Sequence, residues 1–302
     1  MKNNVAKNLK AVCCGEVLWD VFANEKKIGG APLNVALRMQ TLGCNAAMIS
    51  CVGNDRDGYE IIDYVAKQGL DTGGIIISND YPTGIVQVFL DEKRSASYEI
   101  KYPSAWDKIV LNDYAKNLVA NADVLIYGSL ICRDTVSKRA LEALLAYNVY
   151  KVFDVNLRRP HYTQAALEDL MQSADFIKFN DEELLEIATD MGSPYTLLED
   201  NMAFMAQAAK IRSMCVTKGQ HGAILMWQGT LYRNNGYPVI VADTVGAGDS
   251  FLASLISSLL TGNDPQKALD LACAVGALVA EAPGANPVIS YERAEQMALE
   301  HK

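Results

Sequence analysis

Short apolar runs alternate along the chain with longer segments whose apolar residues recur at helical spacing. The short runs predict strands at 11–19, 46–53, 122–130, 150–156, 174–180, 213–219 and 222–227. The longer segments predict helices at 32–43, 58–69, 137–148, 201–211, 248–262 and 265–282. Gly43, Gly69 and Gly262 stand where the C-caps of three of these helices would favour glycine. Because apolar strands alternate with helices, the predicted fold class is α/β, with a mainly parallel sheet covered on both faces.

The segment 83–103 departs from this alternation. Its pattern predicts two strands joined by a polar turn, a hairpin that stands apart from the helices. A hairpin inserted early in an α/β domain is a candidate cover over a ligand site. The chain contains no repeat, low-complexity tract or obvious linker, so residues 1–302 are expected to form one continuous domain.

Charge and cysteine content narrow the function classes. The formal net charge is −9 with three histidines, so the chain lacks the basic face of a nucleic-acid binder. No apolar run approaches the ~20 residues needed to cross a bilayer. The first residues show no signal-peptide cleavage pattern, so we expect a cytoplasmic protein. The seven cysteines include no CxxC pair and no histidine at ligand spacing, which favours buried thiols over a metal or redox site.

The segment VADTVGAGDSFLASLISSLL carries the strongest chemical signal. A strand is expected to end at Ala242 and a long apolar helix to begin near Ala247. Gly246, Ala247 and Gly248 are small, so their backbone N–H groups can face an anion at the helix N-terminus. Asp249 follows in the first helical turn. A carboxylate there can simply complement the helix dipole, but the glycine-rich turn before it favours a functional role.

Polar residues follow several other predicted strands. Each set has an ordinary structural explanation, a tight loop, a turn or a helix start, beside the functional one. The candidates are Asp20 at the end of GEVLWD, Gly29, Gly30 and Asn34 in IGGAPLN, Asp154, Asn156 and Arg158 in FDVNLRRP, Asn180 and Glu183 in FNDEEL, and Thr217, Gly219 and Gly222 in TKGQHG. No GxxxxGK[ST] sequence is present, so a P-loop kinase is excluded.

Taken in order, these segments resemble the ribokinase-like, phosphofructokinase-B-type carbohydrate kinases. The likeness runs from about Val12 to about Glu292, and its most specific parts are GGAPLN and DTVGAGDSF. GNDRDGYE, the hairpin, DVNLR, NDEE and TKGQHG lie between them in the family's order. The resemblance implies a three-layer α/β fold with a small β-sheet lid, built here from about 21–28 and 83–103.

The resemblance also implies a role for each candidate residue. Asp249 would be the catalytic base, in an anion hole formed with Gly246, Ala247 and Gly248. Asp20, Gly30 and Asn34 would bind the sugar, with Arg158 over the site. Asn180 and Glu183 would help to place Mg²⁺ and phosphates, often through water. Thr217, Gly219 and Gly222 would lie beside ATP, and 272–276 near the adenine. A monovalent cation such as K⁺ would bind oxygens of Asp243, Val245, Val279, Ala282 and Gly284.

Within the family, GEVLWDVF, KIGGAPLNVA, YEIKYPSAWD and FDVNLR are most similar to bacterial fructokinases. This likeness implies phosphorylation of D-fructose to fructose 6-phosphate. Kinases of another sugar or nucleoside, such as ribose, 2-keto-3-deoxygluconate or aminoimidazole riboside, are the alternatives, as is a non-catalytic sugar sensor on the same fold. The exposed edge of the lid predicts a homodimer.

Overall fold

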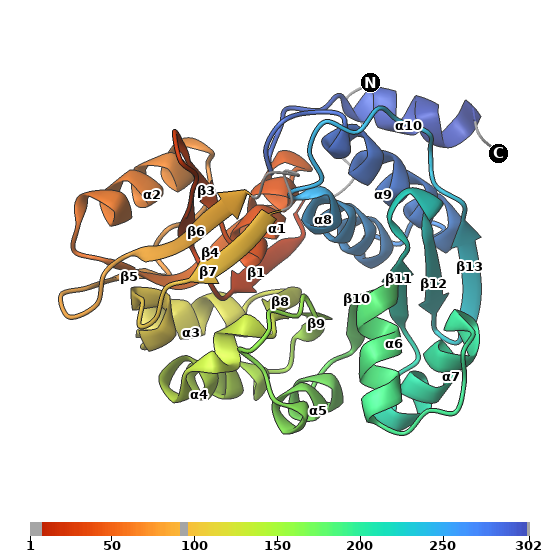
Figure 1. Ribbon diagram of the computed structural model, residues 1–302, viewed down its shortest axis with the longest axis horizontal. Helices are drawn as coiled ribbons and strands as arrows, with labels where there is room; N and C mark the ends of the chain where they lie inside the picture. The colour runs from red at the N-terminus through yellow and green to blue at the C-terminus, as the bar shows by residue number, and fades with distance from the viewer. Residues whose placement is uncertain (1–7, 91–95, 301–302) are drawn as a thin grey trace.

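A nine-stranded sheet forms the centre of the molecule. The computed structural model describes residues 8–90 and 96–300 (Figure 1). The strand order is β13 (Thr230–Asn234), β12 (Ala223–Trp227), β11 (Met214–Thr217), β10 (Phe176–Asn180), β9 (Tyr150–Asp154), β8 (Val124–Gly128), β1 (Lys10–Cys14), β4 (Asn45–Gly53) and β5 (Ile75–Ser78). The pairs from β11 to β5 are parallel, and β12 and β13 complete one edge as antiparallel strands.

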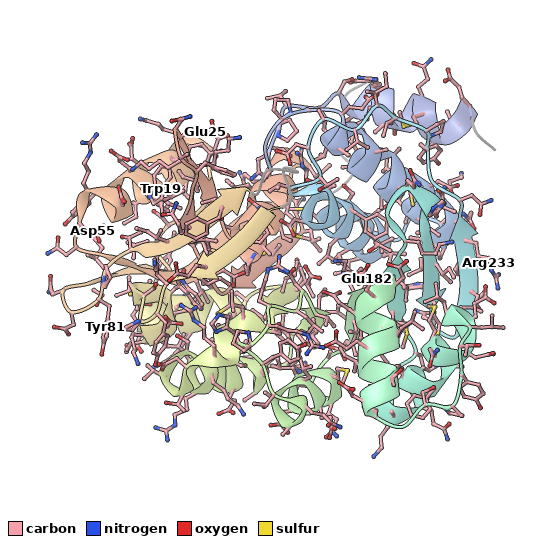
Figure 2. The ribbon with its side chains drawn as sticks, viewed as in Figure 1. Trp19, Glu25, Asp55, Tyr81, Glu182 and Arg233 are labelled. Atoms are coloured by element: carbon pink, nitrogen blue, oxygen red, sulfur yellow. The ribbon has the colours of Figure 1, made fainter. Side chains whose placement is uncertain are left out.

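A second sheet of four strands stands apart from the first, on the side of the molecule that also carries α2 (Figure 1). We call this second sheet the lid. Its order is β3 (Lys26–Gly29), β2 (Leu18–Val21), β6 (Gly84–Leu90) and β7 (Ala96–Ile100). The Trp19 indole N–H donates to the Asp57 carbonyl at 3.1 Å, which ties the lid to the first turn of α2 (Figure 2).

Helices cover both faces of the large sheet. One hydrophobic cluster joins it to α1 (Ala31–Thr41), α2 (Arg56–Lys67), α8 (Ala247–Leu260), α9 (Pro265–Ala280) and α10 (Tyr291–Glu300). A second cluster joins its other face to α3 (Asp113–Ala120), α4 (Thr135–Leu145), α5 (Gln164–Gln172), α6 (Asp181–Asp190) and α7 (Leu198–Ala209). Short 3₁₀ turns lie at Ala105–Lys108, Leu130–Arg133 and Gly219–His221. The predicted three-layer α/β fold with a mainly parallel sheet is confirmed.

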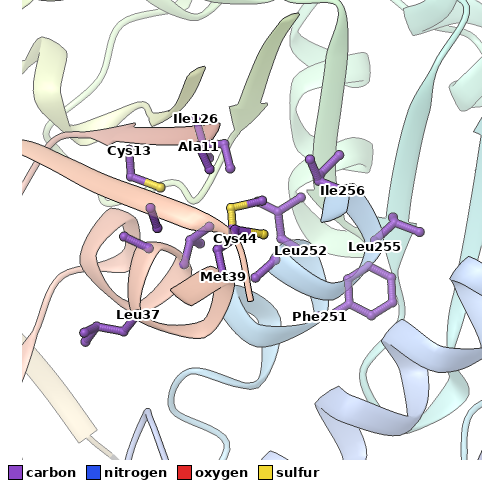
Figure 3. Packing of buried hydrophobic residues seen from close by; sticks show 14 of the residues in the cluster. Ala11, Cys13, Leu37, Met39, Cys44, Ile126, Phe251, Leu252, Leu255 and Ile256 are labelled. Carbon is purple, nitrogen blue, oxygen red and sulfur yellow. The ribbon is translucent and has the colours of Figure 1, made fainter. Parts of the chain in front are cut away.

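Burial follows the strand period. On β1, Ala11 and Cys13 face the first cluster, whereas Val12 and Cys14 face the second. Figure 3 shows side chains of α1 and α8 meeting in the first cluster, with Met39 beside Leu252. All seven cysteines are free, and six of them are buried, so the expectation of buried thiols holds. Among residues 8–90 and 96–300, no helix is long and apolar enough to cross a membrane.

Several boundaries differ from the prediction. The expected strand 11–19 is two strands, because the chain leaves the large sheet at Gly15, where φ is +151°, and enters the lid at Leu18. Asp20 therefore lies on a lid strand and does not end a core strand. The prediction of a strand that ends at Ala242 is wrong, because residues 235–246 belong to no strand. The pattern also missed β5, β13, α3, α5, α6 and α10. The three C-cap glycines are confirmed, with φ of +92°, +79° and +84° at Gly43, Gly69 and Gly262.

Candidate active site

The carboxyl ends of the parallel strands place most of the candidate residues at one edge of the sheet. Asp154 ends β9, Asn180 ends β10 and Thr217 ends β11. Ligands of open α/β sheets gather at this edge. A separate cavity of about 540 Å³ lies at the amino ends of β1 and β4, beside Lys10 and Asn45, so cavity size alone does not identify the site.

The glycine turn before α8 is required by its geometry. Gly246 is the N-cap of α8 and has φ of +76°, a left-handed conformation that favours glycine. A Cβ at position 246 would lie 2.3 Å from the carbonyl oxygen of Ala285, so only glycine fits against the loop 284–287. No side chain caps α8. The backbone N–H groups of its first turn can therefore act as donors to an anion.

Asp249 lies in that first turn, partly buried. Its Oδ2 accepts a hydrogen bond from Asn34 Nδ2 at 2.8 Å, across two helices that are far apart in sequence. Burial, and after it the nearby Asp154 carboxylate, raise the pKa of Asp249 to about 6. The hydrogen bond from Asn34 and the charges of Lys178 and Arg158 oppose that rise. Asp249 is therefore a carboxylate that is ionised at neutral pH and more basic than an exposed aspartate.

The sequence analysis missed Lys178, which lies on β10 with only 7% of its surface exposed. Its Nζ is 3.1 Å from Asp154 Oδ1 and 3.6 Å from the place that a Cβ at Gly248 would take. Burial disfavours its charged form, but Asp154, Glu183 and Asp249 more than compensate and hold its pKa above the ordinary lysine value. The signal was a lysine inside the apolar strand FIKFN, because a buried charge requires a partner.

Asp20 lies on the lid strand β2, and Arg158 lies in the loop that follows β9. Burial raises the pKa of Asp20 to about 6, and the charge of Arg158 partly offsets this. A Cβ at position 29 would lie 2.2 Å from Asp20 Oδ2, so a side chain there would displace the Asp20 carboxylate. Gly30, with φ of +113°, is the N-cap of α1, and a Cβ at this position would strike the Glu16 carbonyl oxygen at 2.4 Å. The exposed Arg158 bonds the carbonyl of Leu157.

Glu16 is a second residue that the sequence analysis missed. It is 4% exposed, and its Oε2 has no hydrogen-bond partner among the described residues. Burial raises the pKa of Glu16 to about 7. Hydrogen bonds from its own amide and that of Ala31, together with the charge of Arg158, oppose the rise, whereas the charge of Asp249 adds to it. The carboxyl group therefore supports the start of α1, just ahead of Asn34.

Asn180 and Glu183 form a capping box at the start of α6, whose first turn also carries Glu182 (Figure 2). Asn180 Oδ1 accepts from the Glu183 amide at 2.7 Å, and Glu183 Oε2 accepts from the Asn180 amide at 2.8 Å. Glu183 Oε1 accepts from the Leu157 amide at 2.9 Å, so each carboxylate oxygen already serves the backbone. This arrangement favours contact with a metal through water over direct coordination. Among the described residues, no group of three or more His, Cys, Asp or Glu side chains has metal-site geometry.

The nucleotide-side candidates lie in a turn and a helix. Thr217 Oγ1 donates to the Phe179 carbonyl at 3.3 Å, and Gly219 faces open space. Gly222 has a structural reason to be glycine, since a Cβ there would lie 2.1 Å from the Asn234 carbonyl oxygen. The stretch 272–276 is an interior part of α9, and Gly276 allows that helix to approach the carbonyl oxygen of Ala247 on α8.

Asp243 joins the two segments that were predicted to hold a monovalent cation. Its Oδ1 accepts from the Val245 amide and its Oδ2 from the Gly284 amide, each at 3.0 Å. The Asp243 amide in turn donates to the Ala280 carbonyl, and the Ala282 amide donates to the Val279 carbonyl. The carboxylate and the neighbouring carbonyls are hard oxygen donors, which fit an alkali-metal ion.

The raised pKa of Asp249 predicts a stability effect. A group whose pKa rises from 3.8 to about 6 on folding destabilises the fold once the pH exceeds both values. Asp249→Asn should therefore be more stable than the wild type at pH 8 and unfold at a higher urea concentration. The expected gain in the free energy of unfolding is roughly 1–3 kcal/mol, since one unit of pKa corresponds to ~1.4 kcal/mol. The difference should vanish below about pH 4. The exposed Asp80→Asn is the control and should change stability little at either pH. Equal stability of Asp249→Asn and wild type at pH 8 would contradict the buried-charge account.

Comparisons with known proteins place this arrangement in a family. Residues 5–290 match the model of the pfkB family carbohydrate kinases. A sugar kinase from Pyrococcus horikoshii is 30% identical, over 93% of this chain and 91% of its own. A 2-dehydro-3-deoxygluconokinase from Thermoproteus tenax is 25% identical, over 96% of this chain and 90% of its own. The solved structure of a fructokinase double mutant from Vibrio cholerae, with fructose, ADP and a potassium ion bound, superposes with a TM-score of 0.80 at 25% identity, over 93% of this chain and 95% of that one. The protein is thus an ATP-dependent carbohydrate kinase of the pfkB family.

Proposed function

We propose that this kinase phosphorylates D-fructose to fructose 6-phosphate, with Asp249 as the general base. The observation that carries the proposal is the position of Asp249. It lies in the first turn of an uncapped helix, hydrogen-bonded to Asn34 on one oxygen, in surroundings that raise its pKa to about 6. A base with a pKa near the working pH combines a large ionised fraction with useful basicity.

The proposed reaction is an in-line phosphoryl transfer. The sugar hydroxyl oxygen bonds to the γ-phosphorus of ATP, while the bond from that phosphorus to the β–γ bridging oxygen breaks. The electron pair leaves with ADP, and the hydroxyl proton passes to Asp249. Because Asn34 occupies Oδ2, Oδ1 is the oxygen proposed to take the proton.

Backbone and side-chain groups around Gly248 would receive the phosphate. The amides of Gly248 and Asp249 at the start of α8 offer donors to the transferring group, whereas the Ala247 amide donates to the Thr244 carbonyl at 3.3 Å. Lys178 Nζ, close to Gly248, adds a fixed positive charge that Asp154 holds in place. Mg²⁺ carried by ATP would neutralise further phosphate charge. Asn180 and Glu183 would reach that ion through water, because their own oxygens serve the capping box. Thr217 and Gly219 would lie beside the nucleotide.

Asp20 and Asn34 are proposed to bind sugar hydroxyls, with Gly30 allowing close approach. Carboxylate and amide groups suit adjacent hydroxyls of a neutral sugar, and the likeness to fructokinases favours D-fructose. One observation favours a second candidate. The exposed Arg158 influences both Asp20 and Asp249, and its positive charge would suit the carboxylate of 2-keto-3-deoxygluconate.

A substrate panel tests the proposal. ADP release is measured with fructose, ribose, 2-keto-3-deoxygluconate, glucose, adenosine and fructose 6-phosphate, each with Mg-ATP. Fructose should give the highest kcat/KM. Asp249→Asn serves as the control and should lose ~10²–10⁴-fold in kcat with fructose, because it lacks the proton acceptor. If another sugar exceeds fructose tenfold, about 1.4 kcal/mol in transition-state binding, the fructose assignment is wrong. Loss of less than about tenfold in the Asn variant would remove Asp249 from the role of base.

We also propose that K⁺ binds oxygens of Asp243, Val245, Val279, Ala282 and Gly284. Asp243 already holds the amides of Val245 and Gly284, so an ion there would stiffen the turn that leads to Gly246. The expected result is faster turnover in potassium chloride than in tetramethylammonium chloride at equal ionic strength. Equal rates in the two salts would rule out the cation site and leave the kinase assignment unchanged.

The lid supports a proposal of a homodimer. Phe89 on β6 and Tyr98 on β7 are 51% and 60% exposed, although Val86 and Val88 of the same sheet are buried. A small sheet with exposed aromatic residues and open edges gains stability by packing against a second copy. Light scattering at micromolar concentration should give the mass of a dimer, and Tyr98→Glu should shift it toward the monomer. Lys67→Glu, a charge change on exposed α2, is the control. A wild-type monomer would contradict the proposal.

A further inference from the structure

Two residues of α1, one helical turn apart, each connect the first turn of α8 to the loop 284–287. Asn34 Nδ2 donates to Asp249 Oδ2, and Asn34 Oδ1 accepts from Asn286 Nδ2, both at 2.8 Å. Arg38 Nε donates to Ser250 Oγ, and an Arg38 guanidinium N–H donates to the Pro287 carbonyl, both at 3.0 Å. One face of α1 thus joins two neighbouring residues of α8, Asp249 and Ser250, to two neighbouring residues of the loop, Asn286 and Pro287.

The direction of these hydrogen bonds matters for Asp249. An asparagine side chain presents a donor on one side and an acceptor on the other, and the two are exchanged when the amide turns over. Because Asn286 donates to Asn34 Oδ1, the opposite side of the Asn34 amide, its N–H₂ group, must face Asp249. With the amide reversed, an oxygen would face the carboxylate and would disfavour its ionised form.

We propose that Asn286 is a positioning residue, which fixes the Asn34 amide so that it donates to the Asp249 carboxylate. The inference rests on the proposed role of Asp249 as the base, which it deepens: the ionised state of the base depends on a residue in a loop 37 positions further along the chain. Asn286 touches Asn34 and acts through it.

The surroundings hold this chain of amides in place. Asn34 and Arg38 are only 5% and 3% exposed, so neither is free to rotate into solvent. The loop is fixed on both sides of Asn286, by the hydrogen bond of Gly284 to Asp243 and by that of Arg38 to Pro287. Asn286 Oδ1 is buried and has no hydrogen-bond partner among the described residues, so it is the N–H₂ group of this amide that bonds Asn34.

Other charges also face Asp249, and they set the background against which Asn286 acts. Asp154 on β9 and Glu16 after β1 oppose its ionisation, whereas Lys178 on β10 and Arg158 after β9 favour it. The Cys13 thiol of β1 also lies within electrostatic reach. None of these groups changes when position 286 is substituted, so Asn286→Ala, which adds no charge, reports on the amide chain alone, whereas Asn286→Asp adds the repulsion of its own carboxylate.

Asn286→Asp should give the larger effect, and Asn286→Ala separates the amide chain from the added charge. An ionised carboxylate only accepts, so Asn34 must turn its N–H₂ group toward position 286 and its oxygen toward Asp249. The expected result is a rise of about one unit or more in the pKa of Asp249. The measurement is a carbon-13 titration of the aspartate carboxyl groups in the unliganded protein, in which the Asp249 signal is assigned by its loss in Asp249→Asn. Asn286→Ala, which removes the donor without adding charge, should shift the titration in the same direction by less.

Val288→Asp is the matched control. It adds the same carboxylate two residues further on, at a fully exposed side chain with relative exposure of 102%. It should leave the Asp249 titration unchanged, and thermal melting shows that each variant is folded. The acid limb of kcat against pH should move with the titrated pKa in Asn286→Asp and, by less, in Asn286→Ala, but not in Val288→Asp. A folded Asn286→Ala protein whose Asp249 titrates as in the wild type overturns the inference, even if Asn286→Asp shows a shift from its added charge. Because the titration needs no turnover, failure of the proposed kinase substrate would leave this result intact.

Discussion

The site depends on keeping one carboxylate ionised where the protein partly excludes water. Burial and the like charge of Asp154 work against the ionised form of Asp249. Its hydrogen bond from Asn34, the charge of Lys178 and the dipole of α8 work for it. The balance leaves a pKa between that of a free aspartate and neutrality, which is the range in which a carboxylate can accept a proton and remain mostly charged.

This balance requires parts of the fold that are distant in sequence. Asn34 comes from α1, Lys178 from β10 and Asp249 from α8, and only the parallel sheet brings the ends of these elements together. The packing of α1 on α8 is hydrophobic, through side chains such as Met39 and Leu252 (Figure 3). A close-packed interface resists displacement, so the amide of Asn34 is held within hydrogen-bonding distance of the carboxylate without help from a ligand.

The sequence predicted the fold class because the spacing of apolar residues and the glycines at the helix ends indicated the same elements. Glycine ends three of the predicted helices and adopts positive φ in each case. The prediction failed at 11–19, where only Gly15 and Glu16 separate two apolar segments. Val17 and Leu18 are as apolar as β1, so hydropathy could not show that the chain had left the core for the lid at Gly15. The amphipathic helices α3, α5 and α6 were missed because their polar faces leave too few apolar residues to stand out.

Most residues proposed for the site were singled out from the sequence. The residues that surround Asp249 and act on it, Asn286, Lys178 and Glu16, were not. Asp249 and the glycines before it are neighbours in sequence, so the role proposed for them could be inferred from one short segment. Asn286 bonds a residue 252 positions away, and its own segment has no periodicity to mark it. Lys178 and Glu16 each lie in an apolar run, where a charged residue among apolar neighbours was the available signal.

The capping box of α6 shows that an ordinary structural explanation and a functional one need not exclude each other. Asn180 and Glu183 satisfy each other's backbone, as in any well-capped helix. Glu183 also accepts from the amide of Leu157, the residue just before Arg158. Through that third hydrogen bond the cap fixes the start of the loop from which Arg158 reaches toward Asp20 and Asp249. A substitution at Glu183 would therefore disturb the site even if the carboxylate never met a metal ion, because it would release the loop that carries the guanidinium group.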